Sequence, residues 1–240
     1  MSGVGTEARA ANRQVYANPC RATAYVDEPY HRTRREIAAT TLVRRGGATG
    51  PVLELGVGAR PMLTAADCPG GGPVVLADLE PAALDRARGP AVRLDATAAL
   101  PFRAGAFSGV LVGELIEHVF DPVRLLEECA RVLRPGGVLV LTTPNLAGVQ
   151  DRLRFLVGKP PRHIAPLHPY LRLHIRPLNR SLARRLLDRA GFEAVDVRSN
   201  YVGWELPDGR WVQSRLLGRL APGLGGSLIV SARTPRRGPR

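Results

Sequence analysis

The sequence predicts a doubly wound, Rossmann-like α/β fold, with a seven-stranded, mostly parallel sheet and a lid insertion after the fifth strand. Several short runs are apolar throughout instead of alternating, as in strands that are buried on both faces of a sheet. Helical patterns lie between these runs, and parallel strands need such crossovers. The chain has 240 residues, of which 45% are hydrophobic, so it is long enough for one such domain with a sizeable core.

The strands and helices are expected to alternate after an initial helix. That helix covers residues 29–45 and stops at Gly46-Gly47. The predicted strands are the apolar runs 51–55, 73–77, 91–94, 109–112, 138–142, 194–197 and 227–232. The predicted later helices are residues 61–67, 81–88, 122–133 and 181–190. This arrangement places the carboxyl ends of the parallel strands at one edge of the sheet, where open α/β sheets bind ligands.

The helix predicted over residues 122–133 carries clear terminal signals. Asp121 is expected to cap its start before Pro122, and Pro135 with the two glycines after it is expected to end it. Cys129 lies inside this helix and is expected to be a buried, inert thiol. The expected buried face consists of residues spaced by three or four positions: Val123, Leu126, Ala130 and Leu133.

Residues 145–176 interrupt the alternation with a stretch rich in Pro, Arg and His. This stretch is too long for an ordinary connection, so we expect a functional lid. The expected organisation is therefore a flexible segment over residues 1–28, a folded domain over residues 29–233 that includes the lid, and a basic tail over residues 234–240.

The formal net charge of +13 comes almost entirely from arginine, because Lys159 is the only lysine. The arginines are scattered instead of clustered among aromatic residues, so no nucleic-acid partner is expected, while an acidic substrate or an anionic membrane surface stays open. No apolar run approaches the roughly 20 residues of a membrane span, and the first residues contain no secretory signal. We therefore expect a cytoplasmic protein without stable membrane insertion.

The cysteine and histidine spacing indicates neither disulfides nor a metal. The three cysteines form no Cys-x-x-Cys pair, and their odd number gives no disulfide framework. No zinc-type spacing of His and Cys is present, and no pair of acids followed by Asn suggests magnesium. The sequence therefore predicts no metal site.

Two strand ends carry residues suited to a nucleoside cofactor. Gly56 and Gly58 follow the first strand and let the backbone approach a ligand closely. Asp78 ends the second strand, where a carboxylate can accept hydrogen bonds from both hydroxyls of a ribose; capping of the next helix is the alternative. Pro61 stands where a dinucleotide motif has its third glycine, and no Walker motif is present, which disfavours hydride transfer and ATP hydrolysis.

Together these motifs resemble class I S-adenosylmethionine-dependent methyltransferases, and closely their type 11, ubiquinone-methyltransferase-like branch. Residues 52–58 resemble the first motif of that family, Asp78-Leu79 its ribose-binding acid, and Leu94-Asp95-Ala96 its adenine-contacting acid. Residues 107–145 and the pattern from His174 to Phe192 resemble the type 11 branch. The resemblance covers roughly residues 50–145 and 172–198.

The resemblance implies S-adenosylmethionine as the cofactor and gives each matched residue a role. Gly56 and Gly58 are expected against its amino-acid portion, with Glu54 steadying its ammonium group. Gly113 and Glu114, after the fourth strand, are expected beside the sulfonium. The expected ribose and adenine contacts come from the ends of the second and third strands: Asp78, Leu79, Asp95 and Ala96.

Arg60 departs from the family pattern, in which the loop has a third glycine. The side chain of Arg60 is therefore expected to point away from the cofactor or to contact the acceptor.

The same resemblance suggests how the acceptor is activated. Methyl transfer is an in-line displacement, and a base is needed only where the acceptor must lose a proton. The candidate catalytic residues are His118 and Glu114, which lie in a Glu-x-x-Glu-His sequence near the expected methyl; positioning of the loop is the alternative role of His118. The candidate acceptor-binding residues are His163, His168, Tyr170 and His174, although His163 and His168 also fit plain exposure.

We therefore expect O-methylation of a small molecule or sugar. A lipid-linked, quinone-like acceptor is the first alternative. A non-catalytic partner protein that binds S-adenosylmethionine is another, and an RNA-modifying enzyme would show binding that depends steeply on salt. The sequence does not indicate the oligomeric state.

Overall fold

A computed structural model describes residues 27–68, 70–85, 89–165, 167, 171–206 and 210–236. Most of the segment expected to be flexible and the last four residues of the expected basic tail lie outside these ranges. So do two of the predicted acceptor-binding residues, His168 and Tyr170.

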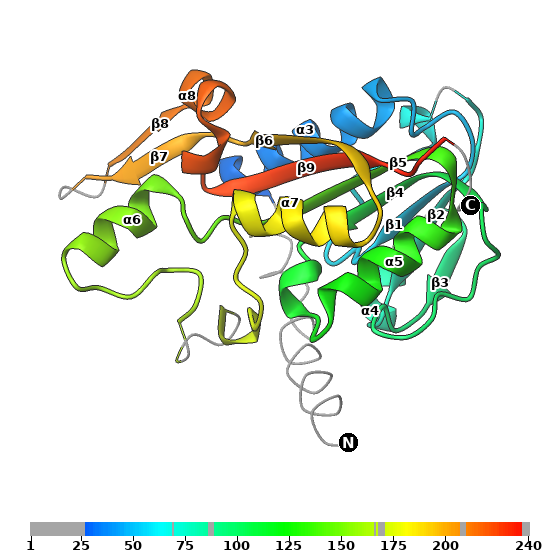
Figure 1. Ribbon diagram of the computed structural model, residues 1–240, viewed down its shortest axis with the longest axis horizontal. Helices are drawn as coiled ribbons and strands as arrows, with labels where there is room; N and C mark the ends of the chain where they lie inside the picture. Colours follow the sequence, from blue (N-terminus) through cyan, green and yellow to red (C-terminus); the bar gives the residue numbers. More distant parts are fainter. Residues whose placement is uncertain are drawn as a thin grey trace.

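One seven-stranded sheet, in the order β3-β2-β1-β4-β5-β9-β6, organises the described chain (Figure 1). β9 runs antiparallel between β5 and β6, and the other neighbours are parallel. The doubly wound, mostly parallel sheet predicted from the sequence is therefore confirmed. Its strands are β1 (Val52–Leu55), β2 (Val74–Asp78), β3 (Ala91–Arg93), β4 (Phe107–Gly113), β5 (Leu133–Pro144), β6 (Glu193–Ser199) and β9 (Ser227–Arg233).

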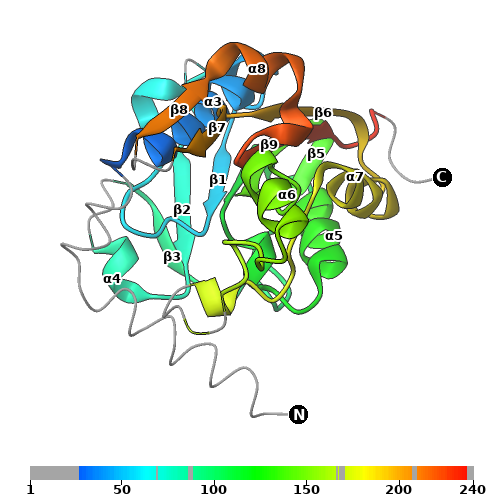
Figure 2. The same ribbon diagram turned by 90° about the vertical axis from the view of Figure 1, so that its left-hand side faces the viewer.

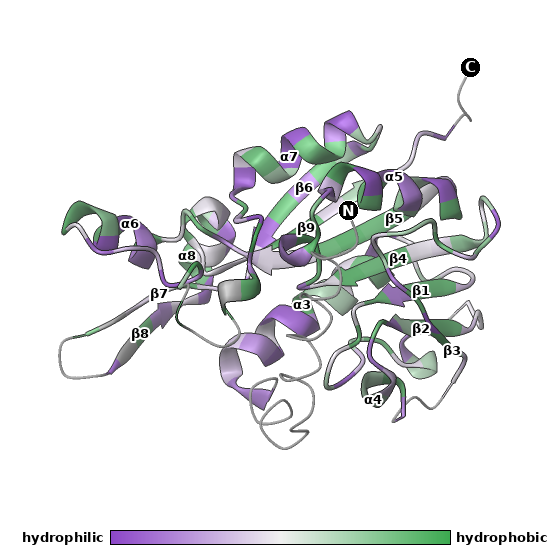
Figure 3. Cartoon of the chain, turned by 90° about the horizontal axis from the view of Figure 1, so that it is seen from below, coloured by the Kyte–Doolittle hydropathy of each residue, from purple (hydrophilic) through white to green (hydrophobic). Residues whose placement is uncertain are grey.

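Helices cover both faces of this sheet. α3 contacts β4, β5 and β9 from one side, whereas α5 and α7 pack together on the other (Figure 1). Figure 3 shows alternating polar and apolar colours along α5 and α7 and hydrophobic colour along β4 and β5, as expected for amphipathic helices on an apolar sheet. The helices are α3 (Pro29–Arg44), α4 (Pro81–Leu84), α5 (Pro122–Val132), α6 (Val149–Leu156), α7 (Arg180–Arg189) and α8 (Arg215–Leu220).

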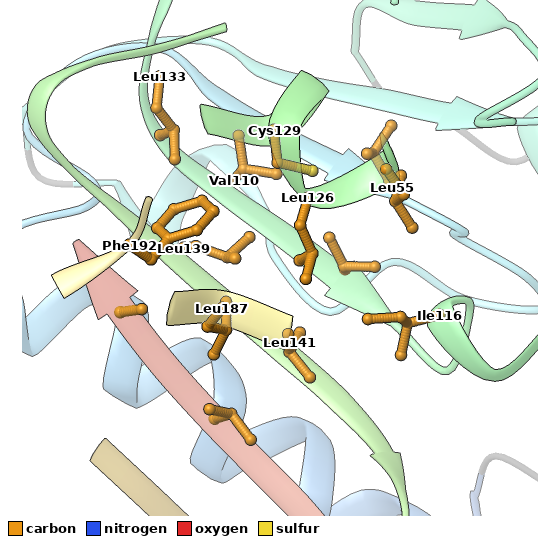
Figure 4. Close-up of a cluster of buried hydrophobic side chains, with 14 of the residues drawn as sticks. Leu55, Val110, Ile116, Leu126, Cys129, Leu133, Leu139, Leu141, Leu187 and Phe192 are labelled. Atoms are coloured by element: carbon orange, nitrogen blue, oxygen red, sulfur yellow. The ribbon is translucent and has the colours of Figure 1, made fainter. Parts of the chain in front are cut away.

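Two apolar clusters fill the space between the sheet and its helices. The larger one joins Leu126 of α5, Leu187 of α7 and Leu139 of β5, all completely buried (Figure 4). The other joins Leu42 of α3 to Leu111 of β4. Burying one such leucine contributes about 1.5–3 kcal/mol, so these clusters hold the strand ends rigidly in place.

α5 confirms the predicted cap and corrects the predicted face. The Asp121 carboxylate accepts the Arg124 N–H at 3.1 Å, and burial raises the pKa of the Cys129 thiol to about 12, as expected for an inert cysteine. The fully buried residues of the helix are Leu125, Leu126, Cys129 and Val132, so the face is rotated from the predicted one. Val123 and Ala130 are only partly buried.

The helix predicted over residues 61–67 is wrong, because this segment contains only a 3₁₀ turn, η1 (Ala65–Asp67). The backbone N–H groups of Met62 and Leu63, which precede this turn, donate hydrogen bonds to the Glu54 side chain and tie the loop to β1. The first crossover therefore remains an extended loop beside the end of β1.

The lid has structure that the sequence did not predict. It contains α6 and a 3₁₀ turn, η3 (Leu171–Leu173), and α6 lies beside β7 (Figure 2). β7 (Val202–Glu205) and β8 (Trp211–Ser214) form a separate antiparallel pair followed by α8.

Among the described residues, no helix combines the length and apolar character needed to cross a bilayer.

Candidate active site

The site lies where β1 and β4 are neighbours and the strand order reverses. Open α/β sheets bind ligands at this position, beyond the carboxyl ends of the strands. The loop after β1, the ends of β2 and β3, and the turn after β4 meet there.

Glu54 organises the loop after β1. Its side chain is completely buried, and its two oxygens accept the N–H groups of Met62 at 2.7 Å and Leu63 at 3.1 Å. Burial raises the pKa of this carboxyl to about 7, although the two backbone hydrogen bonds oppose that rise. In the described chain Glu54 therefore holds the loop from inside.

The two glycines of the loop are required by the backbone. Gly56 and Gly58 have φ values of +76° and +61°, a region that other residues adopt only with strain. A Cβ on Gly56 would lie 3.2 Å from the Gly113 carbonyl oxygen, so a side chain would fill the space between the ends of β1 and β4. Gly113 is also confined, because a Cβ there would collide with the end of the Met62 side chain.

Asp78 connects the first loop to the second strand. One of its oxygens accepts the Gly58 N–H at 3.0 Å, and the other accepts the Glu80 N–H at 2.9 Å. The backbone N–H groups of Val57 and Leu79 also act on this carboxylate as donors, so it lies among several N–H groups at the end of the strand, where it can also accept from ligand hydroxyl groups. The alternative role as a helix cap is wrong, since α4 is preceded by Glu80 and no side chain caps it.

Acidic side chains also lie at the ends of β2 and β3. Asp95 accepts both the Thr97 N–H at 2.9 Å and the Thr97 hydroxyl at 2.6 Å through one oxygen, which fixes the direction of the carboxylate. Leu79 and Ala96, each only partly buried, flank the acids Asp78 and Asp95. An apolar surface between two acids suits a purine above a ribose.

The side chain of Arg60 points out of the loop. This agrees with the expectation that it points away from the cofactor position. Its guanidinium forms an ion pair with Asp27 at 2.8 Å, and both side chains are about half exposed. The carbonyl oxygens of Arg60 and Pro61 accept hydrogen bonds from Arg35 of α3. α3 thus supports the loop at the position where the family has its third glycine.

The turn after β4 contains two acids in different surroundings. Glu114 has a φ of +47° and forms an ion pair at 2.7 Å with Arg34 of α3, whose side chain is 5% exposed. Arg34 in turn donates a hydrogen bond to His31 Nδ1 at 3.0 Å. The sequence offered no signal for Arg34, because its contact partner lies 80 positions away in the chain.

Glu117 is the more unusual acid. It is 1% exposed and lies in η2 (Ile116–His118), and neither of its carboxylate oxygens has a hydrogen-bond partner in the described chain. Burial, and then the nearby charge of Glu114, raise the pKa of Glu117 well above its usual range. Glu117 appeared in the Glu-x-x-Glu-His sequence, but no role was predicted for it.

Three histidines converge next to Glu117. The rings of His118 and His174 lie edge to face with centroids 4.9 Å apart. His118 Nδ1 donates to the Leu173 carbonyl at 3.0 Å, and His174 Nδ1 donates to the His163 carbonyl at 2.9 Å. Glu117, His163 and His174 also line a small pocket, with Pro144, Leu146, Pro177 and Leu178. The structure thus brings together His118, His163 and His174, the described histidines that were predicted to activate or bind the acceptor.

The lid holds His163 through Asp151 of α6. Asp151 is 2% exposed and accepts hydrogen bonds from His163 Nδ1 at 2.9 Å and from the Arg162 N–H at 2.8 Å. Asp151 was not among the predicted residues, since an acid in an irregular stretch gives no recognisable pattern.

Known proteins match part of the chain. A family described as a methyltransferase domain matches residues 53–141. A probable S-adenosylmethionine-dependent methyltransferase of Mycolicibacterium smegmatis is 38% identical over 120 residues, which are 49% of this chain and 42% of that relative. A ubiquinone biosynthesis O-methyltransferase of Caulobacter vibrioides is 50% identical over 42 residues, 18% of this chain and 17% of that protein. The matches therefore span less than half the length of these relatives.

A solved structure matches nearly the whole chain. It is that of 1,6-didemethyltoxoflavin-N1-methyltransferase from Burkholderia thailandensis, with bound 1,6-didemethyltoxoflavin and S-adenosylhomocysteine. The TM-score is 0.62 at 17% identity, and the match covers 96% of this chain and 90% of that chain. At this identity the likeness shows a common fold.

Proposed function

Because residues 53–141 match the family described as a methyltransferase domain, we propose that this protein transfers the methyl group of S-adenosylmethionine to a hydroxyl oxygen of a small molecule or sugar. The resemblance seen in the sequence is confirmed for this segment. S-adenosylmethionine supplies an electrophilic methyl carbon on a sulfonium leaving group. The main support for the proposal is the hydrogen bond from the Gly58 N–H to the Asp78 carboxylate. It joins the glycine loop and the acid expected to bind the ribose into one site.

The cofactor fits the described side chains. We assign the ribose to Asp78, the adenine to Leu79, Asp95 and Ala96, and the amino-acid portion to the backbone at Gly56 and Gly58. Gly113 and Glu114 lie at the adjoining end of β4, where the sulfonium is expected. We assign Glu54 an indirect role, because both its oxygens already hold the loop.

We assign activation of the acceptor hydroxyl to His118. Its Nδ1 donates to the Leu173 carbonyl, so in the neutral ring Nε2 is the nitrogen that can accept a proton. Burial lowers the pKa of His118, which keeps the ring neutral near pH 7 and ready to act as a base. His163 and His174 are proposed to line the acceptor pocket beside it, and we extend that proposal to His168 and Tyr170.

Calorimetry with S-adenosylhomocysteine tests the cofactor site. We expect saturable binding to the wild type, about 100-fold weaker binding to Asp78→Ala because two charge-assisted hydrogen bonds are lost, and no binding of NAD. Asp85→Ala, at an exposed acid near the end of α4, is the matched control and should bind as the wild type does. Failure of the wild type to bind would contradict the cofactor assignment.

Acceptor screening tests the reaction itself. Transfer of labelled methyl to hydroxylated compounds, with mass spectrometry of the product, should give an O-methyl ether. Cofactor binding without turnover on any acceptor would instead favour the non-catalytic alternative.

A lipid-linked acceptor is the second candidate, because α6 and the residue after it expose apolar side chains beside basic ones. Leu153, Phe155, Leu156 and Val157 are between 50% and 81% exposed. Arg152 and Arg154 lie on the same helix. If the acceptor has a lipid tail, turnover should rise in the presence of anionic vesicles, and Phe155→Ser should remove that rise.

A further inference from the structure

Glu117, His118 and His174 form a three-residue cluster. Among the described residues, one potential ligand atom from each lies within 4.8 Å of the others. Glu117 and His118 are neighbours in η2, whereas His174 follows η3 at the return of the lid. No sequence spacing reveals such a set, because more than fifty residues separate its two parts.

The histidines are oriented as metal ligands usually are. Each Nδ1 donates to a backbone carbonyl, His118 to Leu173 and His174 to His163. In a neutral ring this places the lone pair on Nε2, and metal-bound histidines typically use their other nitrogen in such a bond. The lid strengthens the arrangement, because Asp151 fixes His163, whose carbonyl orients His174.

Glu117 supplies an independent observation. Both of its carboxylate oxygens are buried without a hydrogen-bond partner in the described chain. A buried carboxyl group without such a bond is costly unless it holds a proton or a cation. Arg34 is paired with Glu114, and its charge, like the Thr143 hydroxyl, acts on Glu117 only as a secondary influence.

We propose that Glu117, His118 and His174 bind one first-row divalent transition cation, such as Zn²⁺. Two imidazoles and one carboxylate suit such cations, and sites with three protein ligands keep a position open for water or substrate. Ligand bonds of about 2.0–2.2 Å place tetrahedral ligand atoms about 3.4 Å apart, so atoms that lie up to 4.8 Å from one another need to approach by at most about 1.4 Å.

This inference rests in part on the proposed function, and it names the acceptor class more closely. An acceptor hydroxyl on the open position would have its pKa lowered by the cation. Its proton would pass to water, its oxygen would form the bond to the methyl carbon, and the carbon–sulfur bond of the cofactor would break with its electron pair going to sulfur. With the cation bound, His118 activates the hydroxyl as a ligand of the cation, and without it as the base proposed above; acceptors with a coordinating hydroxyl are favoured.

Direct cation binding tests the site without reference to turnover. The full chain, without a histidine tag and after treatment with a chelator, would be titrated with Zn²⁺ by calorimetry and with Co²⁺ by visible absorption. We expect one equivalent to bind, with a cobalt spectrum typical of nitrogen and oxygen ligands. Glu117→Gln and His174→Gln should each weaken binding more than about 100-fold, and Asp151→Asn about 10–100-fold, as for other residues that orient a ligand.

Glu127→Gln, at an exposed position of α5, is the matched control and should bind the cation as the wild type does. Circular dichroism of the same samples shows that each variant is folded, and S-adenosylhomocysteine titrations test the proposed function separately. Cation binding without S-adenosylhomocysteine binding would leave this site standing and contradict the cofactor assignment. Absence of saturable Zn²⁺ and Co²⁺ binding by the wild type, or unchanged affinity in folded Glu117→Gln and His174→Gln, would overturn the site.

Discussion

The cofactor half and the acceptor half of the site are built in different ways. In the cofactor half, Gly58, Asp78 and Asp95 are tied to backbone or side chains near their own strand ends. In the acceptor half, His118 depends on a carbonyl of the lid, and Glu114, which lies between the two halves, depends on Arg34 of α3. One half is therefore encoded by short motifs, and the other is assembled by the tertiary structure.

This difference implies that the two halves respond separately to substitution. Changes in the acceptor half should alter turnover or stability while leaving cofactor affinity nearly unchanged. Changes in the loop after β1 should alter cofactor affinity first.

The largest expected effect is that of His118→Gln. Loss of the group that activates the acceptor should lower kcat by about 10²–10⁴-fold, the usual range for general acid–base catalysis. Initial rates and calorimetry with S-adenosylhomocysteine would be compared for the same samples. A parallel loss of cofactor affinity would contradict the separation of the two halves.

Arg34→Met should destabilise the protein by about 3–5 kcal/mol, because it leaves the largely buried Glu114 carboxylate without its ion-pair partner. Urea unfolding measures this loss. Arg32→Met is the control, since Arg32 lies on the same helix but its ion pair with Glu36 is exposed and should contribute at most about 1 kcal/mol. An equal loss of unfolding free energy in the two variants would show that the buried ion pair stabilises the protein no more than the exposed one does.

Glu54 should make stability depend on pH. Burial raises its pKa to about 7 from the ordinary 4.5, so the folded chain holds a proton that the unfolded chain has lost between these values. Its stabilising contribution is complete below about pH 4.5 and is lost as the pH rises through about 7, by roughly 2–3 kcal/mol. The unfolding free energy of the wild type should therefore fall from pH 5 to pH 8 relative to that of Glu54→Gln, which carries no titrating group at this position; a constant difference between the two would contradict the raised pKa.

Arg60→Gly should have the smallest effect. Its ion pair with Asp27 is about half exposed, and such pairs contribute about 0–1 kcal/mol. Because the side chain points out of the loop, cofactor affinity should change by less than about threefold. A larger change would show that Arg60 takes part in the cofactor half after all.

The sheet and its order of elements were predictable because uniformly apolar strands separated by helices leave few alternatives. At residues 61–67 the only helical part is the short turn η1, which Thr64 and Asp67 cap from both sides, while the N–H groups of Met62 and Leu63 bond to the buried Glu54. The pair β7 and β8 was missed because its strands mix polar and apolar residues and are not part of the main sheet.

The candidate site divides in the same way. Gly56, Gly58 and Asp78 were found because glycine and acid have fixed positions relative to a strand end. Arg34 and Asp151 were missed because their roles depend on partners that the fold brings from elsewhere. Glu117 lay within a recognised motif, but only its burial without a partner revealed that it needs an explanation.

The hydrogen bonds that link Asp151 to His163 and His163 to His174 limit how the lid of one related protein could be replaced by that of another. Its return segment faces His118, so the lid is a structural part of the acceptor pocket and not an interchangeable cover. A chimera that receives a foreign lid would inherit a new selectivity only if all three residues were transplanted as a unit. The evolution of new acceptors in this scaffold is accordingly expected to proceed by co-ordinated replacement of the whole segment.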